Sequence, residues 1–403
     1  MIRVKVIAVA SATIIACSAG PDRAGPTVAT RDSASVRIVE SAAPAWRPGD
    51  EWRIDSLPLL DIGSADGEEP YLFDYVETAI RLGDGTLVVA NASTGQLRFF
   101  DARGRHVRSV GRRGQGPGEF GQSTVHIWRS FDGGIVAEDA GNRRVIVFDS
   151  VGSVLENVTL VTPPGGERPS IQGVLADGSW LVRAGQTGEP GADGQVKQRV
   201  QYHRYQPDGR QVAKLAEVPG PVHMVVSVGR FRTWFEVPFS AAPFAAPQGR
   251  EVLLNAGGAT QLDRLDASGR LLASYRWTAP RRKTADLYDR YRREELATSD
   301  TTFRRVLEAF YARSLPIEEY APGYVRMVVD HGGNAWLQRY YLTAETERLN
   351  DVIAPDGRWL GTVRLPAGSW LMEAGADFVL LWKRDDLGVE HVMLNRLRRD
   401  PRS

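Results

Sequence analysis

The chain has 403 residues, of which 42% are hydrophobic and 25% charged, a balance typical of a globular protein with a real core. Lys and Arg nearly equal Asp and Glu, which leaves a net charge of +1 and argues against nucleic acid as a partner. The 41 glycines and 10 tryptophans are typical of a β-rich repeat protein, which needs many turns and large flat side chains.

The first 16 residues are predicted to be a lipoprotein signal peptide. Arg3 and Lys5 precede a short uncharged run, residues 6–15, which is too short to span a bilayer. The run leads into Ile14-Ile15-Ala16-Cys17, which resembles the bacterial lipobox, with Ile14 where Leu is usual. Cys17 is the only cysteine, so no disulfide can form within the chain. We expect Cys17 to be the lipid-attachment residue.

Residues 17–34 are rich in Ser, Gly, Ala, Pro and Asp, which predicts a flexible tether. No later stretch approaches the length of a transmembrane helix. We therefore expect an exported protein that is held in the bacterial envelope by its N-terminal lipid. Ser18 follows the cysteine where an Asp often signals inner-membrane retention, so we place it at the outer membrane, facing the periplasm or the surface.

Two similar segments, residues 82–111 and 130–160, reveal an internal repeat. Each has an Asp-Gly turn, an aliphatic strand, a strand that ends in Phe-Asp, and a second glycine turn. The two first turns, at Gly85 and Gly133, are 48 positions apart, and so are Gly104 and Gly152. Weaker copies follow, with turns at Gly178 and Gly209, Gly249 and Gly269, and Gly333 and Gly357; residues 373–397 form a last, incomplete copy. Each unit is predicted to contain four short strands joined by hairpin turns.

The N-terminal segments "SVRIVES" (35–41) and "EWRIDSLPLLDIG" (51–63) are predicted strands without a partner in their own neighbourhood. We expect one of them to complete the last unit, because such closure removes an exposed sheet edge. The sequence thus predicts an all-β fold, a six-bladed β-propeller of four-stranded blades over residues 35–398, and a monomer.

Residues 279–315 break the β pattern. Phe303, Val306, Leu307, Phe310 and Tyr311 follow helical spacing, which predicts a small helical insertion between blades. The neighbouring segments "VGRFRTWFEVPF" and "RRKTADLYDRYRR" concentrate Arg and aromatic residues. This pattern is typical both of interfaces and of helices that pack on a sheet.

The stretch "GRRGQGPGEF", residues 111–120, is predicted to cross from the outermost strand of one blade to the innermost strand of the next. Its glycines permit positive φ, Pro117 stiffens the crossing, Glu119 is placed to accept backbone hydrogen bonds, and Phe120 is expected to pack between blades. We take as the structural linker motif Gly111, Gly114, Gly116, Pro117, Gly118, Glu119 and Phe120. A phosphate-binding loop is the weaker interpretation, because no Lys-Ser/Thr pair and no helical segment follow.

"EDAGNRRVIVFDSVG", residues 138–152, resembles the strand pair of NHL repeats, in which an Asp-x-x-Asn-x-Arg turn precedes a Val-x-Val-Phe-Asp strand. The matching turn residues are Asp139, Asn142 and either Arg143 or Arg144. Together with the linker and the lipobox, the chain is similar to the bacterial six-bladed β-propeller proteins. The resemblance is sharp over residues 76–160, and it implies a fold but no particular activity.

The sequence shows no catalytic constellation. The histidines, which have no metal-ligand spacing, are His106, His126, His203, His223, His331 and His391. The five Asp-Gly pairs, at Asp84, Asp132, Asp177, Asp208 and Asp356, are better explained as turns than as calcium ligands. No Gly-x-Ser-x-Gly motif is present. We therefore predict no catalytic, cofactor or metal residues.

Two functions remain open. The preferred one is a non-catalytic binding or scaffold propeller in the cell envelope that engages a protein, peptide or glycan. The alternative is a metal-dependent propeller enzyme, similar to NHL-type lyases or lactonases, with Ca or Zn at its central channel.

Overall fold

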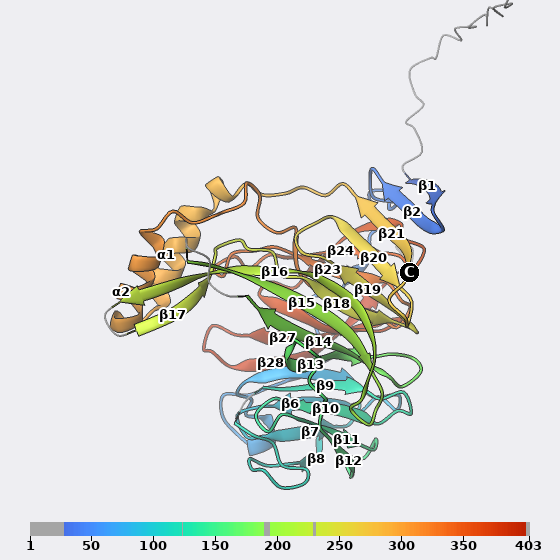
Figure 1. The fold of residues 1–403 in the computed structure, drawn as a ribbon. Coiled ribbons are helices and arrows are strands. Elements are labelled where there is room, and N and C mark those ends of the chain that lie inside the picture. The colour runs from blue at the N-terminus through green and yellow to red at the C-terminus, as the bar shows by residue number, and fades with distance from the viewer. Residues whose placement is uncertain (1–27, 123, 189–193, 229–230, 400–403) are drawn as a thin grey trace, which may run out of the picture.

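A computed structural model describes residues 28–122, 124–188, 194–228 and 231–399. Its strands form six sheets, the blades of a β-propeller (Figure 1). The innermost strands contact one another in a closed ring, in the order β5, β9, β13, β18, β22, β26 and back to β5. The predicted six-bladed architecture is confirmed.

Three blades have the expected four antiparallel strands. Blade 1 contains β5 (Val76–Arg81), β6 (Leu87–Asn91), β7 (Gln96–Phe100) and β8 (His106–Val110). Blade 2 contains β9 (Val125–Arg129), β10 (Ile135–Asp139), β11 (Arg144–Phe148) and β12 (Val154–Val158). Blade 5 contains β22 (Tyr324–Val329), β23 (Ala335–Arg339), β24 (Arg348–Ile353) and β25 (Trp359–Leu365).

Blades 3 and 4 carry additional strands on their outer edges. Blade 3 contains β13 (Glu167–Val174), β14 (Trp180–Thr187), β15 (Gln195–Tyr205), β16 (Gln211–Val228) and β17 (Phe231–Glu236). Blade 4 contains β18 (Phe244–Gln248), β19 (Glu251–Asn255), β20 (Gln261–Leu265) and β21 (Leu271–Trp277), followed by β2 (Val36–Ser41) and β1 (Val28–Ser33).

N-terminal strands close the ring at blade 6. This blade consists of β26 (Ser369–Ala374), β27 (Phe378–Arg384) and β28 (Glu390–Arg398), and it is completed by β3 (Arg53–Ile54) and β4 (Leu60–Ile62). Both short strands pair antiparallel with β28. Of the two predicted N-terminal segments, 51–63 therefore completes the last blade. The other, which includes β2, pairs parallel with β21 instead and buries Val39 against Tyr275.

Six clusters of buried side chains form the core of the ring, one between each pair of neighbouring blades. Strand β6 shows how the sequence builds them. Val88 and Ala90 face blade 2, whereas Leu87 and Val89 face blade 6, and all four are fully buried. Because both faces of the blade are covered, β6 is apolar from Leu87 to Ala90 and does not alternate with polar residues.

The predicted helical insertion contains η2 (Thr284–Asp286), α1 (Tyr288–Thr298) and α2 (Thr301–Tyr311); another short turn, η1 (Glu69–Tyr71), precedes blade 1. The helices pack on the distal half of β16 and on β17, where Phe235 stacks on Phe310. We call residues 219–228, 231–236 and 284–311 the arm. Figure 1 shows the arm to one side of the propeller, far from blades 1 and 2. The Arg- and aromatic-rich segments thus include a helix-on-sheet core.

Candidate functional site

The glycine-rich stretch lies where the sequence analysis placed it, between β8 of blade 1 and β9 of blade 2. Of its four glycines, Gly111 and Gly118 have left-handed backbone, with φ of 87° and 72°. Gly114 and Gly116 do not have positive φ, so positive φ is required at only half of the expected positions.

Two side chains hold this linker in place. Phe120 is fully buried in the cluster between blades 1 and 2 and lies 6.2 Å from the ring of Phe148. The Glu119 carboxylate accepts hydrogen bonds from the backbone N–H of Gly116, at 2.8 Å, and from Arg112, at 2.7 Å. Both contacts hold the pKa of Glu119 below its usual range. The linker residues are thus structural.

The turn after β10 ties the same linker to blade 2. Asp139 is buried and accepts hydrogen bonds from the backbone N–H groups of Gly121 and Asn142. The Asn142 amide donates to the Gly114 carbonyl at 2.8 Å. Arg144 donates to Asp139 and also to three linker carbonyls, those of Gln115, Gly116 and Glu119.

Of the two arginines that the sequence offered for this turn, Arg144 makes the contacts with Asp139 and the linker. Arg143 has left-handed backbone, with φ of 55°, and its side chain is exposed. Cys17, the predicted lipid-attachment residue, lies outside the described residues.

An axial channel of about 470 Å³ is lined by the inner strands of all six blades. One group of charged side chains in and beside it comprises Glu77 of β5, His126 of β9 and Arg326 of β22. His126 Nε2 lies 3.8 Å from Glu77 Oε2, but burial raises the pKa of Glu77. Burial and the charge of Arg326 lower the pKa of His126. At neutral pH the contact is therefore not an ion pair.

A second group in the channel is linked by hydrogen bonds. His331 Nε2 lies 2.7 Å from Glu373 Oε1, and Arg129 contacts both side chains. The other Glu373 oxygen accepts the backbone N–H of Arg81 at 2.6 Å. This network joins blades 1, 2, 5 and 6, so it stabilises the ring as well as making the channel polar.

The histidines do not converge. His126 and His331 line the channel, whereas the other four do not. Among residues 28–399, outside the undescribed positions, no group of three His, Cys, Asp or Glu side chains is arranged to hold a metal ion. The five Asp-Gly pairs are turns, in each of which the Asp carboxylate accepts the backbone N–H two residues later. In the described part of the chain no helix is long and apolar enough to cross a membrane.

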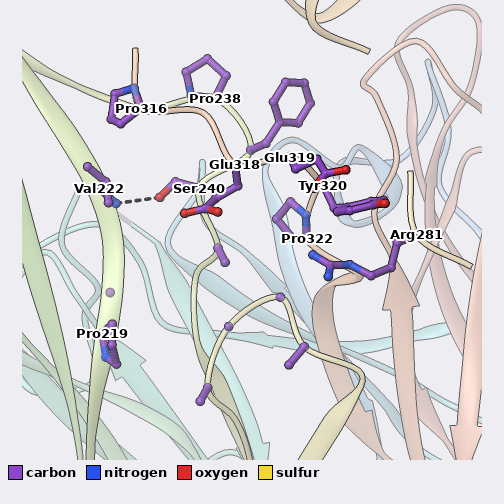
Figure 2. A pocket seen from close by; sticks show the side chains of 17 residues that line it. Pro219, Val222, Pro238, Ser240, Arg281, Pro316, Glu318, Glu319, Tyr320 and Pro322 are labelled. Atoms are coloured by element: carbon purple, nitrogen blue, oxygen red, sulfur yellow. Dashed lines mark hydrogen bonds between the residues drawn. The ribbon is translucent and has the colours of Figure 1, made fainter. Parts of the chain in front are cut away.

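A groove of about 560 Å³ lies where the arm meets blade 4 (Figure 2). Its walls are backbone-rich, with Gly257 and Gly258, and carry four prolines: Pro219, Pro238, Pro316 and Pro322. Ser240 accepts the backbone N–H of Val222 at 2.7 Å, which ties the loop after β17 to β16.

The charged side chains of the groove lie on the two segments that connect the helical insertion to the propeller. Arg281 precedes the helices, and Glu318 and Glu319 follow them. The guanidinium of Arg281 stacks on the Tyr320 ring, 4.8 Å from its centre. Glu318 and Glu319 are exposed, and among the described residues neither carboxylate forms an ion pair. The backbone carbonyls of both accept the Thr284 hydroxyl, so the segment is fixed while its carboxylates stay free.

A central channel was expected only under the metal-dependent alternative and without any of its residues, and the groove was not expected. Their side chains come from inner strands and loops far apart in the chain, such as Arg129 and His331, which are 202 residues apart. The one usable signal was the concentration of Arg and aromatic residues near the insertion, and it located the arm.

Comparison with known proteins agrees with the fold. A family model described as a six-bladed β-propeller (DUF5128) matches residues 69–161, which are blades 1 and 2. No curated protein matches the chain.

Among solved structures, an exported protein from Bacteroides fragilis is 13% identical with a TM-score of 0.45, and covers 90% of this chain and 99% of its own. A member of the DUF4221 family from Bacteroides vulgatus is 11% identical with a TM-score of 0.47, covering 87% and 99%. Virginiamycin B lyase from Staphylococcus aureus is 9% identical with a TM-score of 0.41, covering 86% and 99%. At these values, the activities of the similar proteins say nothing about this one.

Proposed function

We propose that this protein is a non-catalytic binding propeller of the bacterial cell envelope, which engages an extended segment of a partner protein in the groove between arm and blade 4. The observation that carries the proposal is the groove itself. It is built on structure added to the propeller, the arm, and its wall of prolines and glycine backbone suits a peptide in extended conformation.

The charges of the groove favour a partner segment with a basic side chain. Glu318 and Glu319 are exposed and form no ion pair among the described residues, whereas Arg281 is stacked on Tyr320. An opposite charge in the ligand would complement these two carboxylates and speed its association.

The lipobox-like sequence that ends at Cys17 supports anchoring by lipid, with the propeller as the exported part. Fractionation of a Cys17→Ala variant tests the anchoring. We expect it to leave the membrane fraction while keeping a folded domain, and continued partition with membranes would contradict the proposal.

Crosslinking in cells tests the groove. A photoreactive amino acid at Ala241, which lines the groove, is expected to give one discrete protein adduct, and mass spectrometry should place the crosslink in an extended segment with a Lys or Arg. The double variant Glu318→Lys, Glu319→Lys should abolish the adduct, whereas the double variant Glu156→Lys, Glu308→Lys, an equal change of charge at exposed positions on β12 and α2, should not. Three results would overturn the peptide assignment: no adduct, an adduct that persists in the Glu318→Lys, Glu319→Lys variant, or a glycan bound in the groove.

Metal analysis of the purified chain separates this proposal from the metal-dependent enzyme. A stoichiometric, tightly held Ca or Zn ion at the channel would favour the enzyme. A metal-free protein that still forms the groove adduct would support the binding function.

A further inference from the structure

A pocket of about 400 Å³ lies between blades 2 and 3, far from the arm groove in the fold. It is formed where β9, β11 and β13 begin and where β10 ends. His126 and Ser170 line both this pocket and the axial channel, so the two adjoin. The volume is within the range of small-molecule sites in proteins.

Two arginines with unusual backbone line the pocket. Arg143 and Arg168 have φ of 55° and 25°, and they are two of the few non-glycine residues with positive φ in the described chain. Such conformations are costly, and they gather at binding sites, where they aim side chains. Neither guanidinium has a hydrogen bond or an ion pair among the described residues, in contrast to Arg144, which is committed to Asp139 and the linker.

The inner wall of the pocket holds a buried acid. Glu138 is 7% exposed, and its carboxylate accepts the Ser170 hydroxyl at 3.0 Å. Across the strand pair it lies opposite His126. No cation forms an ion pair with Glu138 among the described residues, so its burial is not offset by charge, and burial raises its pKa to about 7. At neutral pH the carboxyl group is therefore able to donate a hydrogen bond as well as accept one.

The remaining polar wall consists of hydroxyl groups, from Thr124, Thr159 and Thr162. Paired guanidinium groups recognise planar carboxylates, and hydroxyl groups recognise other hydroxyls. A doubly charged phosphate is a poorer fit, because the buried carboxyl group of Glu138 lies in the same wall.

We propose that this pocket binds a small hydroxylated carboxylic acid, of which a uronic-acid sugar is an example. Its carboxylate is held by Arg143 and Arg168, and one of its hydroxyl groups is hydrogen-bonded to Glu138 and Ser170. This site goes beyond the function proposed for the arm groove, since it takes a small molecule and uses different blades.

Calorimetry on the purified chain tests the ligand class with glucuronate, glucose and glucose 6-phosphate. We expect glucuronate to bind at least about tenfold more tightly than the other two, because only it combines a single carboxylate with neighbouring hydroxyls. If glucose bound as tightly as glucuronate, the arginines would not contribute to binding through a carboxylate. Tighter binding of glucose 6-phosphate would assign the site to phosphate, and no binding of glucuronate would overturn the proposal.

A double variant tests the two arginines. Arg143→Gln with Arg168→Gln is expected to weaken glucuronate binding about tenfold or more, because the carboxylate loses both charge-assisted partners. Arg103→Gln changes an exposed arginine in a turn of blade 1, outside the pocket, and should bind as the unchanged protein does. A double variant with unchanged affinity would refute the assignment.

The pH dependence tests Glu138 without removing a ligand contact. An ionised Glu138 repels the bound carboxylate, so affinity should fall as the pH rises from about 6 to about 8, through the raised pKa. The isosteric Glu138→Gln variant stays neutral, so its affinity should be independent of pH in this range. A flat profile for the unchanged protein, or an equal slope for the variant, would contradict the role of Glu138.

Other charged groups face Glu138 from the neighbouring strands: His126 on β9, Asp139 on β10, Arg143 and Arg144 in the turn and at the start of β11, Arg168 on β13 and, beyond His126, Glu77 on β5. Burial and Arg326 lower the pKa of His126, so it is already neutral over most of the test range. The Glu138→Gln comparison subtracts any contribution that remains, since all of these groups are present in both proteins.

Discussion

Arg144 joins two parts of the fold through a single guanidinium. It donates to the buried Asp139 and to three carbonyls of the linker between blades 1 and 2. Polar groups removed from water need such partners, and an unpaired buried carboxylate is especially unfavourable. The adjacent Arg143 makes none of these contacts.

We therefore expect Arg144→Met to lower the free energy of unfolding by about 3 kcal/mol, because Asp139 loses its cation and the linker loses its donors. Arg143→Met should change it by less than about 0.5 kcal/mol, as is usual for exposed positions. Urea unfolding of both variants checks the contrast. Equal losses would mean that Arg144 does not hold the linker.

Phe120 holds the same linker through apolar contacts. It is fully buried between two blades, so Phe120→Ala should cost about 3 to 5 kcal/mol of unfolding free energy through lost contacts and the cavity that remains. Phe131→Ala is the matched control, since Phe131 is 70% exposed in a turn of blade 2. Denaturant titration measures both. A cost below about 0.5 kcal/mol would place Phe120 at the surface.

At the scale of elements, the linker between blades 1 and 2 shows that its position could be predicted from the sequence, whereas the backbone angles of its glycines could not. The glycine run correctly marked a blade crossing, because only turns tolerate so much glycine. The sequence does not distinguish the four glycines, since φ at each depends on how the chain meets Phe120 and Glu119 in space. Left-handed backbone occurs at Gly111 and Gly118 and not at Gly114 or Gly116.

Alanine at Gly111 should therefore destabilise the fold by about 2 kcal/mol more than alanine at Gly116. At Gly111, with φ of 87°, a Cβ atom would approach the Phe120 ring to 2.8 Å and the Gly95 carbonyl to 2.9 Å. At Gly116 its nearest neighbours would be atoms of the Glu119 carboxylate, at 3.1 Å, which can shift more easily than backbone. Thermal unfolding compares the two variants, and a larger loss at Gly116 would contradict this account of the crossing.

For the whole molecule, the repeat of 48 residues made the propeller predictable, because each unit buries its faces only against its neighbours. The channel and pockets were not predictable by the same route. Arg129, His331 and Glu373 meet only because their blades close into a ring, and nothing near each of them in the sequence indicates the others. The sequence offered two candidate segments for completing blade 6. The structure shows that residues 51–63 do so, because β3 and β4 pair with β28.

Truncation of the N-terminus tests whether β3 and β4 close the ring at blade 6. A chain that begins at Ala42 lacks β1 and β2 but keeps the strands that pair with β28, so it should unfold cooperatively with a moderately lower Tm. A chain that begins at Ser64 also lacks β3 and β4. Its blade 6 then has an open edge at β28, which should broaden the unfolding transition and cause self-association. Circular dichroism melts and size-exclusion chromatography distinguish the two chains.

A peptide of residues 51–63 added to the chain that begins at Ser64 should restore a cooperative, monomeric protein, because it supplies the missing partners of β28. A peptide of residues 35–41 carries β2, which pairs with β21 of blade 4, and should not restore it. Rescue by both peptides would show general shielding of hydrophobic surface and not ring closure. Rescue by neither, with both truncated chains behaving alike, would mean that the ring does not depend on the N-terminal strands of blade 6.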